Sequence, residues 1–138
     1  MTGTVILGFG PGGSGQRPGP PAGRLQPCPD SPNCVSSKSS DPRHRIAPIA
    51  YTGSGAEGKQ KLVEVIRSLP RTRILSNEGP YLYVAFVSAV FRFADDVEFL
   101  VDEAQKVIHV RSASRVGYWD LGVNRRRVEA IRQMMATH

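Results

Sequence analysis

Four short segments with the period-two pattern of β-strands follow one another in the middle of the chain, and they restrict the fold more than any other feature. They cover residues 72–76, 81–87, 91–101 and 106–112. The turns at residues 77–80 and 102–105 are short, and turns of that length join antiparallel neighbours. Where Asp95 and Asp96 interrupt the third segment, we expect a β-bulge. The pattern predicts a meander of about four strands, one face of which needs a cover.

Two helices are predicted to supply that cover. Ser54 and Glu57 have the spacing of a capping box, and the helix that follows them ends at Pro70. Asn124 is a favourable N-cap for a second helix. The apolar stripes are Leu62, Val65, Ile66 and Leu69 in the first helix, and Val128, Ile131, Met134 and Met135 in the second. We therefore predict an α+β fold, in which an antiparallel sheet of four to five strands has two helices packed on one face.

Length and composition allow one such domain. The chain has 138 residues, and eight of its 14 glycines and four of its 11 prolines lie within the first 24. We expect a flexible tail at residues 1–24 and a single α+β domain at residues 25–138. The G-x-G-x-x-G match that begins at Gly8 is followed by prolines instead of a helix, which argues against a dinucleotide site. No apolar run suits a membrane span or a secretory signal, so we expect a cytoplasmic protein.

The cysteines Cys28 and Cys34 are the only two in the chain, and they lie in a proline-rich loop. Three states stay open for them: a disulfide, free thiols, or part of a metal site. A zinc ion would need two further ligands, and no spacing in the sequence demands them. We therefore predict no metal and no cofactor. If the two cysteines are bridged, an extracytoplasmic location is the alternative.

Residues 111–127 are the candidate binding site, because guanidinium groups, hydroxyls and a helix start occur together there. Residues 111–138 contribute +4 to the net charge of +6. Three arginines fall in the first helical turn, where the helix dipole disfavours cations unless a negative group lies nearby. We predict that an anionic small ligand or partner binds there. The predicted ligand-binding residues are Arg111, Ser112, Ser114, Arg115, Tyr118, Asp120, Asn124, Arg125 and Arg126.

Two alternatives to this binding function stay open. An enzyme acting on a small anionic substrate would use Asp96 and Tyr118 as acid/base groups, with Asp95 as a further candidate. The second alternative is a structural or interaction module, including one that binds nucleic acid by stacking Tyr118 and Trp119 on bases. A run of three arginines is weak evidence for nucleic acid, so we do not expect it as the partner.

A purely structural role for the charged residues is also open. In that interpretation the two aspartates pair with Arg111 and Arg115 and hold the loop to the sheet. A hydrolytic serine–histidine pair is not predicted, because His109 and Ser112 point to opposite faces of an extended strand.

Three separated stretches resemble one protein family. They are residues 28–37, 91–99 and 111–126, which read CPDSPNCVSS, FRFADDVEF and RSASRVGYWDLGVNRR. Together they are similar to the domain-of-unknown-function family 1499 across about residues 25–134, and three motifs in the same order make the resemblance specific. It implies a small α+β domain without an established activity. Because relatives are often exported or tethered to a membrane, it also favours a bridge between Cys28 and Cys34.

Overall fold

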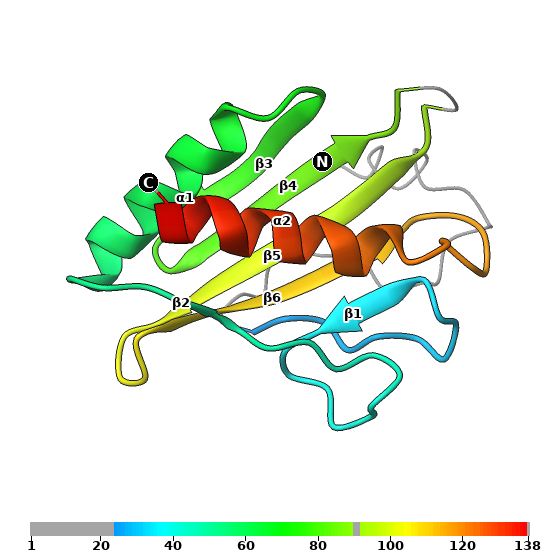
Figure 1. The fold of residues 1–138 in the computed structure, drawn as a ribbon, viewed down its shortest axis with the longest axis horizontal. Coiled ribbons are helices and arrows are strands. Elements are labelled where there is room, and N and C mark those ends of the chain that lie inside the picture. Colours follow the sequence, from blue (N-terminus) through cyan, green and yellow to red (C-terminus); the bar gives the residue numbers. More distant parts are fainter. Residues whose placement is uncertain (1–23, 90–91, 138) are drawn as a thin grey trace, which may run out of the picture.

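The computed structural model describes residues 24–89 and 92–137, which form a six-stranded antiparallel sheet with two helices on one face (Figure 1). In chain order the elements are β1 (Cys34–Ser36), β2 (Ile49–Ala50), α1 (Gly55–Arg67), β3 (Thr72–Glu78), β4 (Tyr81–Val87), β5 (Ala94–Asp102), β6 (Val107–Ser114) and α2 (Val123–Thr137). This confirms the predicted α+β class. The predicted flexible tail at residues 1–24 lies outside the described residues, apart from Arg24.

The strands β3 to β6 form the predicted meander, and two short strands extend it. The order across the sheet is β1-β6-β5-β4-β3, and β2 also pairs with β6. The sequence predicted four to five strands, so the count is slightly higher than expected. The additional strands have three and two residues, which is too short for a period of two to be visible. Only their hydrogen-bonded pairing with β6 identifies them as strands, because their own sequence pattern does not.

The bulge predicted at Asp95 and Asp96 is wrong. β5 pairs with both of its neighbours without a change of register, and the irregularity lies in β3, between Ile74 and Ser76. The two aspartates stay in a regular strand because each has an arginine partner on its own side of the sheet. The strand also begins at Ala94 in the structure, later than the sequence predicted.

The start of α1 agrees with the prediction, and the start of α2 differs from it. At α1, Ser54 and Glu57 each accept a hydrogen bond from the other's backbone N–H, which confirms the capping box. α2 begins at Val123, so the assignment of Asn124 as its N-cap is wrong. The Asn124 side chain turns toward the sheet and bonds there, and the carboxylate of Asp120 accepts the hydrogen bond from the Asn124 backbone N–H.

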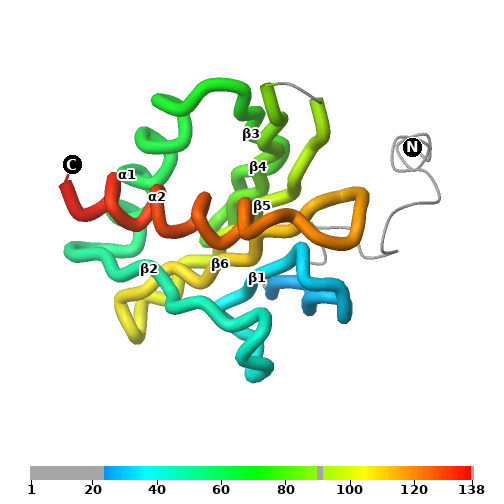
Figure 2. Tube along the Cα trace, turned by 45° about the vertical axis from the view of Figure 1, so that its right-hand side comes forward, coloured from blue at the N-terminus to red at the C-terminus, as the bar shows by residue number. Residues whose placement is uncertain are grey.

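The hydrophobic core lies between the two helices and the sheet face that they cover (Figure 2). Phe99, in the middle of β5, is fully buried there. The predicted stripes of both helices face this core, with Leu69 and Met134 packed at its edge. Its members include Leu62, Val65, Ile66, Leu82, Val84, Val97, Phe99, Ile108, Val110, Val128, Ile131 and Met135. No helix in the described part of the chain is long and apolar enough to cross a membrane.

Candidate functional site

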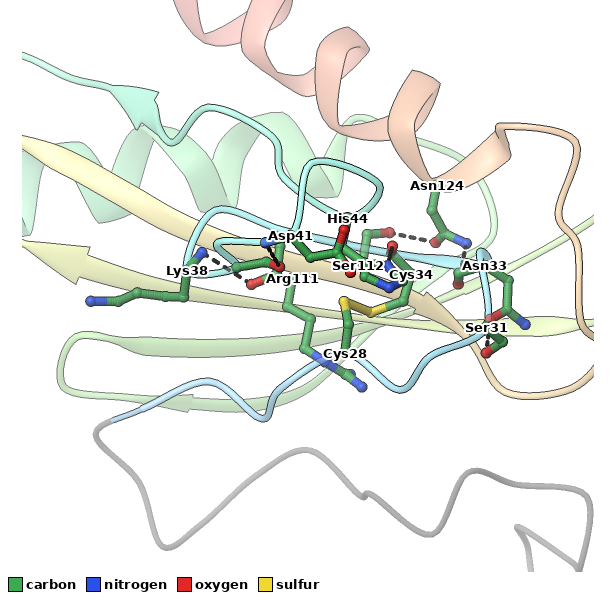
Figure 3. Close-up of a disulfide and its surroundings, with 12 residues drawn as sticks. Cys28, Ser31, Asn33, Cys34, Lys38, Asp41, His44, Arg111, Ser112 and Asn124 are labelled. Carbon is green, nitrogen blue, oxygen red and sulfur yellow. Dashed lines mark hydrogen bonds between the residues drawn. A yellow bond between two sulfur atoms is a disulfide. The ribbon is translucent and has the colours of Figure 1, made fainter.

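The predicted site residues are divided between the two faces of the sheet, because successive residues of β6 point to opposite sides. Ser112 and Ser114 bond to Asn124 of α2, whereas Arg111 extends on the other side toward Cys28 (Figure 3). We name two groups accordingly. The helix-side cluster consists of Asn33, Asp95, Ser112, Ser114, Asp120, Asn124 and Arg127. The far-side cluster consists of Tyr81, Tyr83, Asp96, Glu98, Arg111 and Arg115.

Asn124 is the centre of the helix-side cluster and is fully buried. Its Oδ1 accepts a hydrogen bond of 2.6 Å from the Ser112 hydroxyl. Its Nδ2 lies 2.9 Å from the Ser114 hydroxyl oxygen and 3.2 Å from the carbonyl oxygen of Asn33, and both oxygens accept from it. The amide therefore links three separate parts of the chain, and its hydrogen-bonding groups are occupied by protein atoms.

Asp120 satisfies the backbone at the start of α2. Its two carboxylate oxygens accept hydrogen bonds from the backbone N–H groups of Gly122, at 2.8 Å, and Asn124, at 3.0 Å. Burial by itself raises the pKa of Asp120, but these donors outweigh it and hold the pKa below its ordinary value. The negative group that the helix dipole favours at this position is therefore the protein's own carboxylate.

The three arginines at the start of α2 have different partners. Arg127 donates to Asp95 at 2.6 Å, and burial nevertheless raises the pKa of that carboxyl above its ordinary value. Arg125 and Arg126 donate to backbone carbonyl oxygens, those of Arg45 at 2.9 Å and Leu121 at 2.8 Å. Among the described residues, neither Arg125 nor Arg126 has a carboxylate partner.

The far-side cluster contains a buried ion pair between neighbouring strands. Glu98 lies opposite Arg111 in the register of β5 and β6, with Glu98 Oε1 and Arg111 Nη1 3.7 Å apart. The Tyr81 hydroxyl donates to Glu98 Oε2 at 2.7 Å. Burial lowers the pKa of the Arg111 guanidinium, and the charge of Glu98 opposes that shift. Arg111 Nε has no hydrogen-bond partner within the described segments.

Asp96 lies beside this pair and is bonded from two sides. It accepts hydrogen bonds from Arg115 Nη2 at 2.8 Å and from the Tyr83 hydroxyl at 2.7 Å. Burial and the charge of Asp96 raise the pKa of Tyr83 well above its ordinary value. Tyr118, the acid/base partner considered for Asp96, is exposed on the loop after β6, and no hydrogen bond between the two is found in the part of the chain that the structure describes. The enzyme alternative stays a prediction.

The disulfide is present, joining Cys28 to Cys34 with an S–S distance of 2.02 Å (Figure 3). It attaches the segment before β1 to the edge of the sheet, close to the far-side cluster. Cys34 is fully buried, and the described chain has no free cysteine. Of the three states left open by the sequence, the structure contains the bridge.

Exposed apolar side chains gather between β6 and α2. The loop there extends beyond the start of α2 in Figures 1 and 2. We call residues 116–123 the aromatic tip. Tyr118 is 70% exposed and Trp119 is 68% exposed. The other exposed apolar residues of the aromatic tip are Val116, Leu121 and Val123. The Asn33 amide holds this loop through a 2.8 Å hydrogen bond to the carbonyl oxygen of Gly117.

Sequence reasoning did not include four residues that the structure brings into these groups, namely Asn33, Tyr81, Tyr83 and Arg127. The sequence-based interpretation paired Arg111 with the aspartates, whereas counting back from the turn between β5 and β6 places Glu98 opposite it. Asn33 and Arg127 carried no such signal, since their partners are set by how β1 and α2 pack on β6.

Comparison with known proteins identifies the family. The family model described as "Protein of unknown function (DUF1499)" matches residues 24–135. No curated protein and no solved structure matches the chain. The matched range contains both clusters, the disulfide and the aromatic tip. As its three sequence motifs predicted, the chain belongs to the DUF1499 family.

Proposed function

We propose that this protein is a binding module that takes an anionic partner at the aromatic tip and the adjoining start of α2. Arg125 and Arg126 supply positive charge, and Tyr118 and Trp119 supply contact surface. One observation carries the proposal. Two large aromatic side chains are more than two-thirds exposed in the loop directly before two arginines that lack a carboxylate partner among the described residues. Exposed apolar clusters on otherwise well-packed proteins commonly mark interaction sites.

The proposed site contains fewer residues than the set predicted from the sequence. Ser112 and Asn124 are fully buried and bonded to each other, and Ser114 is bonded to the same amide. These residues support the loop from behind and are not offered as ligand contacts. Arg115 is likewise engaged by Asp96. The exposed side chains of the proposed site are those of Val116, Tyr118, Trp119, Leu121, Val123 and Arg126, and that of Arg125 is half-buried.

The charge balance favours an anion as the partner. Asp120 already serves the backbone N–H groups at the helix start, so we do not propose a ligand for them. The guanidinium charges of Arg125 and Arg126 remain without a negative partner, because both donate to neutral carbonyl oxygens. A negatively charged partner would supply that missing charge and could stack on the aromatic rings.

The fluorescence of Trp119 tests the proposal directly, because it is the only tryptophan in the chain. Titration with polyphosphate is expected to change Trp119 emission, and added salt should reverse the change. Arg126→Gln should weaken the binding about two- to fivefold, since an exposed ion pair contributes at most about 1 kcal/mol. The loss of a cation from the first turn of α2 should leave the fold intact.

Arg73→Gln is the matched control. Arg73 is exposed on the edge strand β3, which β4 and β5 separate from β6, and its replacement changes the net charge by the same amount. Equal weakening by both variants would mean that only the net charge matters, which contradicts a defined site. An unchanged Trp119 spectrum with polyphosphate, citrate and inorganic phosphate would contradict the proposal as a whole.

A further inference from the structure

The aromatic tip contains most of the large apolar residues that are exposed in the described chain. Of seven large apolar residues that are exposed there, five belong to residues 116–123. A sixth, Phe93, is 55% exposed in the loop before β5. Phe93 directly precedes β5, whose first residue lies beside the start of the aromatic tip, since the Arg115 backbone N–H donates to the carbonyl oxygen of Ala94. One end of the molecule therefore presents an apolar projection formed by the aromatic tip, and Phe93 is close to its start.

The backbone conformation of Leu121 indicates that holding this projection in place costs folding free energy. Its side chain is 64% exposed, and its backbone has φ of 58°, in the left-handed region that disfavours leucine. Folding gains little burial from this side chain. The Asp120 carboxylate and the Asn33 amide nevertheless fix the loop on both sides of it. Strained residues that are held this way occur preferentially at binding and functional sites.

Arginines surround the apolar projection. Arg126 donates to the carbonyl oxygen of Leu121, which places a guanidinium directly behind the exposed leucine. Arg125 lies in the same helical turn, and Arg92 is exposed in the loop that carries Phe93. None of these three arginines has a carboxylate within ion-pair distance in the described ranges.

This combination fits the surface of an anionic bilayer. Tryptophan and tyrosine favour the headgroup layer of a membrane, and aliphatic side chains favour the acyl boundary beneath it. Arginines at that depth contact lipid phosphates and are attracted by the negative surface potential. A nucleic acid would use the aromatic rings and the charges, but it would leave Val116, Leu121 and Val123 without an apolar partner. The aliphatic residues therefore favour lipid.

We infer that the aromatic tip docks on an anionic phospholipid surface, with Trp119 and Leu121 entering the interfacial layer and Arg92, Arg125 and Arg126 contacting phosphates. This inference rests on the proposed function and names the partner of the same site. The contact is peripheral, because it uses only side chains of the aromatic tip and of three arginines.

Vesicles provide the test. With phosphatidylcholine vesicles that contain phosphatidylglycerol, Trp119 emission is expected to shift to shorter wavelength, and its quenching by acrylamide should decrease. Pure phosphatidylcholine vesicles should give a much smaller effect. Leu121→Asn should reduce partitioning to the anionic vesicles about tenfold, because the variant loses the favourable transfer free energy of one apolar side chain. Asparagine tolerates the left-handed backbone, so the melting temperature should stay the same or rise.

Leu75→Asn is the matched control, since Leu75 is 43% exposed on the edge strand β3, which β4 and β5 separate from β6. If Leu121→Asn and Leu75→Asn partition alike, insertion of the aromatic tip is refuted. If neutral and anionic vesicles bind equally well, the role of the arginines is refuted. If polyphosphate changes Trp119 emission and vesicles do not, the lipid partner is refuted and the proposed function stands. If neither changes it, both proposals fail.

Discussion

Asn124 shows at the scale of a single residue how one side chain joins distant parts of this protein. It contacts the hydroxyls of two β6 residues and the carbonyl oxygen of Asn33, which is 91 positions away in the sequence. No apolar residue of similar size can satisfy these groups, and buried polar groups that lose a partner are costly. Its role is to hold the start of α2 and the loop before β1 against the sheet.

We therefore expect Asn124→Ala to lower the free energy of unfolding by about 2–4 kcal/mol, because it leaves buried hydroxyl and carbonyl groups without a partner. Chemical denaturation measures this change. Asn77→Ala, at an exposed position of β3, is the control and should have little effect. Similar free energies for the two variants would show that the buried amide does not stabilise the fold.

At the scale of elements, the segment before β1 depends on a covalent attachment. The Cys28–Cys34 bridge closes a loop of only six positions, and β1 itself has three residues. Short edge strands have few backbone hydrogen bonds of their own. The bridge therefore limits the freedom of residues 24–33 in the unfolded chain and keeps them beside β6 in the folded one.

Replacement of both cysteines by alanine should lower the free energy of unfolding by about 2 kcal/mol, the value expected for a loop of this length. Hydrogen exchange should become faster in residues 24–36 and stay slow in β5, which lies inside the sheet. A reductant should lower the melting temperature of the natural protein and leave that of the variant unchanged. The expectation is wrong if the natural protein gains two hydrogen atoms by mass and melts at the same temperature.

At the scale of the whole molecule, the two faces of the sheet are buried by different chemistry. The helix-covered face is mostly apolar, with a polar cluster at the start of α2, whereas the far-side cluster buries charges, with Glu98 fully buried and Arg111 2% exposed. A buried charge that loses its counter-charge is strongly destabilising, even where replacing the whole pair costs little. We therefore expect the buried ion pair of the far face to favour the observed register of β5 against β6, whereas the hydrophobic core supplies most of the apolar burial.

A double-mutant cycle on this pair tests that division. Arg111→Met should cost about 3–5 kcal/mol, because it leaves the buried Glu98 carboxylate without its guanidinium partner. The combination of Arg111→Met with Glu98→Gln should recover part of that loss, since the charge is removed along with its partner. Free energies from denaturation measure the coupling. Strictly additive costs would show that the two groups do not act as a pair.

Much of the fold was predictable because it follows from neighbours in the sequence. The capping box at Ser54 and Glu57, the apolar stripes of both helices and the meander from β3 to β6 all depend on short-range patterns. The site was predictable only in part. The sequence indicated the loop after β6 as charged and aromatic, but it did not distinguish the buried Ser112 from the exposed Tyr118.

What the sequence determined by itself is the two helices, the four strands of the meander, the order of these elements and the concentration of arginine and aromatic residues before α2, because these properties are local. The tertiary structure alone decided which groups meet. The register of β5 against β6 put Glu98 opposite Arg111, and the packing of α2 turned Asn124 inward and made Asp120 the group that satisfies the helix start. Such contacts depend on the positions of whole strands and helices, and no short stretch of sequence contains that information.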